Sequence, residues 1–143
     1  MPSFERREVH LTLPVVRDME IAATAQVGVL GELLQMERDQ IDEVKLAVVE
    51  ACINAFEHSG TPDRKVEIEF VADEKSGRPF LEVGVIDAGC GFDPARVAEP
   101  VIREKIHSKE KRGWGLKIIE SLMDDVRIES GVHGTRIVMR KYL

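Results

Sequence analysis

The sequence predicts an α/β two-layer sandwich in which helices cover one face of a mixed, mostly antiparallel sheet. Two observations lead to this fold class. Apolar residues recur at strand spacing in some segments and at helix spacing in others. Their order is strand, two helices, two strands, a long segment without periodicity, a helix and two strands. Because helices do not alternate with strands, a doubly wound parallel sheet is not expected.

The N-terminal part is expected to hold one strand and two helices. In residues 8–13, EVHLTL, apolar side chains alternate as in a strand, and Pro14 ends that strand. A helix is predicted over about 17–36. A second helix begins at residue 39 or 40 and runs to about residue 58, where the turn-forming residues SGTPD follow.

The C-terminal part is expected to hold four strands and one short helix. In chain order these are VEIEF at 66–70, LEVGVI at 81–86, the helix GLKIIESLM at 115–123, VRIES at 126–130 and TRIVMRKY at 135–142. DEKSGRP is predicted to form a hairpin loop between the first two strands, and GVHG joins the last two. Residues 88–112 show no clean periodicity, and at about 25 residues such a loop is usually functional or disordered.

Composition limits the class of protein. A chain of 143 residues suits one domain, 1–143, with a real core, and the net charge of −6 disfavours general nucleic-acid binding. Cys52 and Cys90 match no zinc or redox spacing, so we expect reduced thiols and a cytoplasmic protein. No apolar run approaches the length of a membrane span, and the N-terminus has no signal-peptide core.

The second predicted helix has two distinct faces. One arc is apolar: Ile41, Val44, Val48, Ala51 and Ala55. The other arc is polar: Glu43, Glu50, Asn54, Glu57 and His58. Glu50 and Asn54 lie one turn apart, so their side chains point the same way. In an isolated helix this would be an ordinary solvated face, and only the surrounding motifs favour a functional reading.

Two pairs of glycines supply that context. In DAGCGF, Asp87 ends a buried strand and is followed by Gly89 and Gly91. Its carboxylate can accept a hydrogen bond from an exocyclic amine while the glycines admit a ligand close to the backbone. In KRGWGL, Gly113 and Gly115 open a helix whose N–H groups suit a phosphate. Each motif alone is as typical of a plain turn.

Taken together, the motifs resemble a known superfamily. The order E-x-x-x-N-A, D-x-G-x-G, a long loop, G-x-G before a helix and GTRIVM is similar to the histidine-kinase-like ATPases with the Bergerat fold, over about 7–142. Within that superfamily, EVHLTLP, VVEACINAFEHS and SLMDDVRIES resemble the RsbW/SpoIIAB-type anti-sigma factors, which are serine-protein kinases.

The resemblance implies a role for each motif. ATP and Mg²⁺ are the expected cofactors. Asp87 would accept a hydrogen bond from the adenine amine, with Gly89 and Gly91 beside the base and ribose. Asn54 would coordinate Mg²⁺, and Glu50 would take the proton from an attacking serine hydroxyl.

The same resemblance assigns further nucleotide contacts. They are Lys109, Lys111, Arg112, Gly113, Gly115 and Thr135. The glycines would present N–H groups to the phosphates, and the cations would neutralise charge on the transferred group. Residues 92–112 would form a lid over the nucleotide. For the three cations, a solvated basic loop is an equally good interpretation.

The resemblance also implies partners: a sigma factor, a STAS-domain anti-anti-sigma protein and a second copy of the chain. Val9, Leu11 and Leu13 offer a candidate dimer surface. Two alternatives remain, a nucleotide-gated binding module without kinase activity and a catalytic domain acting on a separate histidine phosphotransfer protein. Glu50 disfavours both, because histidine kinases usually carry Asn or His there and a pure binding module needs no base. A switch-type kinase of the same family is equally compatible.

Overall fold

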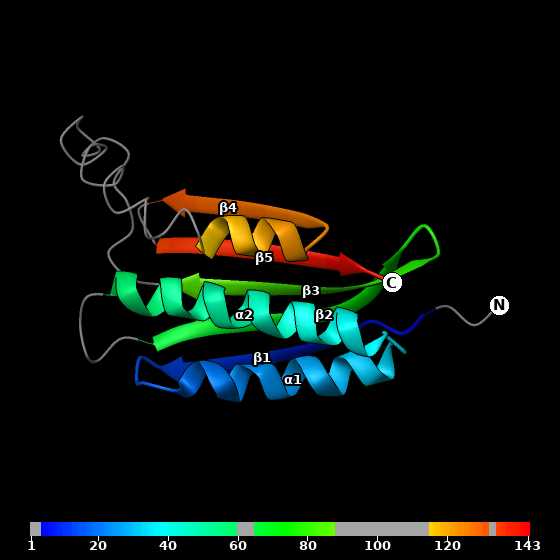
Figure 1. The fold of residues 1–143 in the computed structure, drawn as a ribbon, viewed down its shortest axis with the longest axis horizontal. Coiled ribbons are helices and arrows are strands. Elements are labelled where there is room, and N and C mark those ends of the chain that lie inside the picture. The colour runs from blue at the N-terminus through cyan, green and yellow to red at the C-terminus, as the bar shows by residue number, and fades with distance from the viewer. Residues whose placement is uncertain (1–3, 60–64, 88–114, 132–133) are drawn as a thin grey trace.

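The computed structural model describes residues 4–59, 65–87, 115–131 and 134–143. In chain order the labelled elements are β1 (Arg7–Pro14), α1 (Met19–Leu33), α2 (Arg38–Ser59), β2 (Lys65–Lys75), β3 (Arg78–Asp87), β4 (Asp125–Gly131) and β5 (Gly134–Tyr142). A further helix spans residues 115–122, between β3 and β4. The helices lie on one face of the sheet (Figure 1), so the predicted two-layer α/β sandwich is confirmed.

The strands form one sheet in the order β1-β2-β3-β5-β4. The prediction allowed a mixed sheet, but each pairing between the described strands is antiparallel. Apolar residues in matching register build the helix-facing side. One row across the sheet runs Leu11, Ile68, Val85, Ile137 and Ile128. Because side chains alternate along a strand, this register turns every second residue of each strand toward the helices.

The predicted apolar arc of α2 packs onto this side of the sheet. Val44, Val48 and Ala51 are fully buried, and Ala55 is nearly so. Burying such an arc supplies most of the stability of a helix in a folded protein, since isolated helices are marginal in water. The opposite arc of α2 is thereby aimed away from the sheet, and its position is fixed by the core rather than by its own side chains.

The first helix is shorter than predicted at both ends. It begins after Asp18, whose φ is 72°, and ends before Gln35, whose φ is 59°. Both residues adopt the left-handed conformation, which cannot continue a right-handed helix. The periodicity over 17–36 is therefore correct for the core of the helix but does not locate these two turns.

The loop predicted at 73–79 is in fact a two-residue turn. Ser76 and Gly77 both have positive φ, 53° and 78°, as in the type I′ turn that suits the right-handed twist of a β-hairpin. The flanking residues pair in register up to Lys75 and Arg78. Polar residues at the ends of β2 and β3 masked this extension in the sequence.

The residues of the candidate dimer surface on β1 also contact the core of the same molecule. Leu13 is buried, and Val9 and Leu11 pack against the core of the same molecule. Leu13 is thus taken up by the core, whereas Val9 and Leu11 remain partly exposed, and a dimer contact through β1 stays a prediction. No helix in the described part of the chain is long and apolar enough to cross a membrane.

Candidate functional site

The polar arc of α2 carries the first two site residues. Asn54 is buried, with 9% of its surface exposed, and Glu50 is half-buried one turn earlier. Asn54 and Asp87 are the polar side chains that are buried among the described residues. Burying a polar group costs free energy unless it has a partner, so residues of this type are retained in a core for packing specificity or for function.

Gly115 lies directly against that pair, as the first residue of the 115–122 helix. A Cβ added to Gly115 would stand 3.3 Å from Asn54 Nδ2 and 3.4 Å from Glu50 Oε2. It would also stand 3.6 Å from Asn54 Oδ1. The absence of a side chain here therefore lets the start of a helix approach a carboxylate and an amide. The structure thus brings Gly115 beside two residues, Asn54 and Glu50, that precede it in the sequence by 61 and 65 positions.

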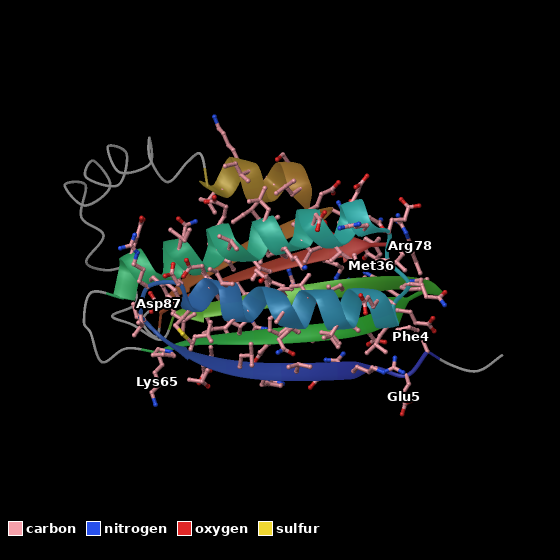
Figure 2. All side chains as sticks on the ribbon, turned by 60° about the horizontal axis from the view of Figure 1, so that its bottom comes forward. Phe4, Glu5, Met36, Lys65, Arg78 and Asp87 are labelled. Atoms are coloured by element: carbon pink, nitrogen blue, oxygen red, sulfur yellow. The ribbon has the colours of Figure 1, made fainter. Side chains whose placement is uncertain are left out.

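The third element of the site is the end of β3. Asp87 is its last residue and has 5% of its surface exposed. In the antiparallel register, Asp87 lies opposite Thr135 of β5 on one side and Val66 of β2 on the other. Thr135 is therefore a cross-strand neighbour of the buried carboxylate. Figure 2 shows Asp87 at the edge of the molecule where α2 ends.

The other predicted contacts lie outside the described residues: Gly89, Gly91, Lys109, Lys111, Arg112, Gly113 and the lid at 92–112. The same holds for Cys90, and for the side chain of His58. The site that the structure describes therefore consists of Glu50, Asn54, Gly115, Asp87 and Thr135.

Cys52 lies between Glu50 and Asn54 in the sequence but takes no part in the site. Its side chain points into the core and is fully buried. Burial raises the pKa of the Cys52 thiol to about 12, and the negative charge of Glu20 acts in the same direction. A thiol that stays protonated at neutral pH is a poor nucleophile, so Cys52 is a packing residue.

Sequence reasoning missed one contact of the same polar arc. Glu43 lies on the same polar arc as Glu50 and Asn54, but its Oε2 lies 2.5 Å from Nζ of Lys141 on β5. That lysine also donates to the carbonyl of Leu122, at 2.6 Å. A carboxylate and a lysine this far apart in the sequence carry no local pattern, so the pair emerges only from the fold.

The chain is an α/β sandwich in which a buried carboxylate ends a strand and a second carboxylate and an amide face the start of a helix. The model of the histidine kinase-like ATPase domain matches residues 16–141, so the chain belongs to that family. The resemblance seen in the sequence is therefore confirmed, together with its expectation of ATP binding.

Named relatives are similar over most of the chain. The anti-sigma F factor of Halalkalibacterium halodurans is 29% identical over 141 residues, covering 96% of this chain and 94% of that protein. The serine-protein kinase RsbW of Bacillus subtilis is 33% identical over 109 residues, covering 73% of this chain and 66% of the relative.

The fold also occurs in solved structures, one of which covers two domains. It contains the RsbU and RsbW domains of a Mycobacterium tuberculosis protein and superposes with a TM-score of 0.67 at 21% identity. The match covers 94% of this chain and 31% of that longer chain. At this identity the likeness concerns the fold alone.

Proposed function

We propose that the protein is an ATP-dependent serine-protein kinase that acts as an anti-sigma factor. In this role it binds an alternative sigma factor and phosphorylates a serine of a STAS-domain anti-anti-sigma partner. The observation that carries the proposal is the convergence of Glu50 and Asn54 on Gly115. The names of the relatives, anti-sigma F factor and serine-protein kinase RsbW, support the same role.

The adenine end of the nucleotide is proposed to bind at Asp87. A buried carboxylate offers a strong acceptor for the exocyclic amine of adenine, because charge-assisted hydrogen bonds gain strength in a low-dielectric surrounding. Thr135 lies opposite on β5 and contributes a hydroxyl to the same end of the sheet. An aspartate at the end of a strand is well suited to this task, since two neighbouring strands fix its backbone.

The phosphates and Mg²⁺ are proposed to bind between α2 and the 115–122 helix. The described residues hold no cluster of three or more His, Cys, Asp or Glu. Asn54, however, offers an amide oxygen beside Gly115, and this oxygen fits the ion. Magnesium prefers one or two protein oxygens together with phosphate oxygens and water. When bound, the ion would neutralise charge on the phosphate oxygens. Gly115 would present its backbone to those phosphates.

Glu50 is proposed to act as the general base. The serine hydroxyl oxygen of the partner attacks the γ-phosphorus, and its proton passes to the Glu50 carboxylate. The bond from the γ-phosphorus to the bridging oxygen breaks, and ADP leaves with the electron pair. Glu50 stands one helical turn from Asn54 and faces the same glycine, so base and phosphate ligand lie on one rigid helix.

Calorimetry tests the nucleotide site first. We expect wild-type protein with Mg²⁺ to bind ATP and ADP, and Asp87→Asn to lose at least about tenfold in affinity, because a charged acceptor is removed. Asp42→Asn is the matched control, since Asp42 is exposed on α2. Failure of the wild type to bind at millimolar nucleotide would refute the proposal.

Transfer is then assayed with candidate STAS-domain proteins and labelled ATP. Acid-stable phosphate on a serine of the partner is the expected product. Acid-labile phosphate would instead favour a histidine-directed catalytic domain, and nucleotide binding without any transfer would favour a nucleotide-gated binding module.

A further inference from the structure

Lys141 joins three elements of the fold through one ammonium group. It lies on β5, and its Nζ is 2.5 Å from Glu43 Oε2 on α2 and 2.6 Å from the carbonyl oxygen of Leu122. The Lys141 side chain has 12% of its surface exposed and the Glu43 side chain 39%, so the pair is partly buried, mainly on the lysine side. An ion pair of this kind is screened less than one on the open surface.

The ammonium holds one end of the 115–122 helix, whose other end is the candidate site. Leu122 is the last residue of this helix, and Gly115, its first, faces Glu50 and Asn54. The helix runs antiparallel to α2 (Figure 1). Leu122 and Glu43 share the Lys141 ammonium at one end, and Gly115 faces Glu50 at the other. Along α2, Glu43 and Glu50 are as many residues apart as Gly115 and Leu122 are along the short helix. Each separation is a rise of about 10.5 Å at 1.5 Å per residue. The distance from the Lys141 contacts to the candidate site is therefore the same along both helices.

A helix this short needs an external anchor. Eight residues do not form a stable helix alone in water, and Ile119 and Met123 bury apolar side chains here. Apolar contacts resist separation of two helices but are non-directional, so they oppose sliding less than a polar contact of fixed geometry does. Lys141 supplies that contact, and its charge also complements the negative end of the helix dipole.

The neighbouring backbone reinforces this end of the helix. Asp124, just beyond the helix, accepts a hydrogen bond from the backbone N–H of Tyr142 at 2.7 Å. The backbone N–H of Asp124 donates to the carbonyl of Arg140 at 2.9 Å. The residues on both sides of Lys141 are thus bonded to the segment that follows the 115–122 helix, so the lysine is held in place from its own strand.

We propose that Lys141 is a positioning residue for the nucleotide phosphates. By fixing the C-terminal end of the 115–122 helix on Glu43, it sets the distance at which Gly115 faces Glu50 and Asn54. Lys141 itself does not contact the nucleotide. This inference rests on the proposed function, since it assigns the phosphates to the space that Gly115 borders.

The test compares ligands with and without phosphates. ATP with Mg²⁺ and adenosine are titrated into the full chain as wild type, Lys141→Met and Lys141→Arg. We expect Lys141→Met to lose about fivefold to tenfold in ATP affinity, equivalent to one polar contact, and to keep adenosine affinity within twofold. Lys141→Arg retains the charge and restores most of the ATP affinity. Lys75→Met, at an exposed lysine of the β2–β3 hairpin, is the control and changes neither.

Hydrogen exchange on the protein without nucleotide gives a second readout. Lys141→Met and Glu43→Gln are expected to speed amide exchange within residues 115–122 while the middle of α2 keeps its protection. Glu43→Gln tests the same contact should Lys141→Met fail to fold, since it keeps the lysine and its contact to Leu122.

The outcomes separate the two proposals. Equal ATP affinity in wild type and Lys141→Met, or parallel losses for ATP and adenosine, would overturn the positioning role and leave nucleotide binding intact. Unchanged exchange in residues 115–122 would overturn it as well. A wild type that binds neither ligand would refute the nucleotide site, and the positioning role would fall with it.

Discussion

Gly115 faces Asn54 although the two residues belong to different motifs and to different helices. A Cβ on Gly115 would lie 3.3 Å from the amide nitrogen of Asn54, which is closer than side chains ordinarily approach. A side chain at Gly115 would therefore crowd the packing of the 115–122 helix on α2. A phosphate-binding role for the backbone N–H comes in addition to this steric reason.

Gly115→Ala is the first prediction from this contact. The methyl group forces the side chains of Asn54 and Glu50 to move by a few tenths of an ångström. We expect ATP affinity to fall about threefold to tenfold, with the free energy of unfolding changed by less than about 1 kcal/mol because alanine is the better helix former. Gly28→Ala is the control, since its Cβ meets only Lys45 at 3.6 Å. Unchanged ATP affinity in Gly115→Ala would show that Asn54 and Glu50 accommodate the methyl group without loss.

Glu50→Gln separates chemistry from binding. The amide keeps the shape of the side chain but accepts no proton, so we expect phosphoserine formation to slow by about 10²- to 10⁴-fold. ATP affinity should stay within about threefold, because the amide retains the polar contacts of the carboxylate. Single-turnover transfer and calorimetry measure the two effects. Glu57→Gln, exposed on the same helix, is the control, and full activity in Glu50→Gln would exclude Glu50 as the base.

The sequence predicted the parts of the site that depend on local pattern. Both faces of α2 follow from a period of 3.6 residues, and the buried position of Asp87 follows from the alternation of β3. Thr135 could be placed near Asp87 only by family resemblance, and the register of β3 and β5 confirms that they are neighbours.

Long-range contacts were beyond the reach of pattern. Lys141 and Glu43 are 98 residues apart, and no periodicity links a strand lysine to one glutamate among several on a polar arc. The packing of Val9, Leu11 and Leu13 against the core could not be predicted for a related reason. Alternation shows that one face of a strand is apolar, but the sheet order decides that the protein's own helices cover it.

The Cys52 thiol predicts a specific alkaline instability. Its pKa is raised by burial from 9.0 to about 12, so the folded state keeps a proton that the unfolded state releases above pH 9. Stability from this group is complete below pH 9 and is lost as the pH rises toward 12, by up to about 1.4 kcal/mol per pH unit. Urea unfolding from pH 8 to 10.5 should therefore show a steeper loss in wild type than in Cys52→Ala. An equal loss of stability with pH in wild type and Cys52→Ala would mean that the thiol ionises in the folded protein.

Gly31 and Gly28 make a matched pair for stability, since both lie in α1. A Cβ on Gly31 would stand 2.7 Å from Ile41 Cγ1 and 2.9 Å from its Cδ1, whereas the Cβ of Gly28→Ala meets Lys45 at an ordinary distance. We expect Gly31→Ala to lower the free energy of unfolding by about 1–3 kcal/mol through overpacking. Gly28→Ala should raise it by about 0.5–1 kcal/mol, because alanine loses less backbone entropy.

Ile41 decides the sign of the Gly31 effect. In an Ile41→Ala background both clashing atoms are gone, so Gly31→Ala should become neutral or stabilising there. Urea midpoints for the four proteins of this double-mutant cycle, at a constant m-value, give the coupling free energy. A Gly31→Ala variant that is as stable as Gly28→Ala in the wild-type background would show that Ile41 yields by rotating. The contact between α1 and α2 would then be looser than the 2.7 Å approach implies.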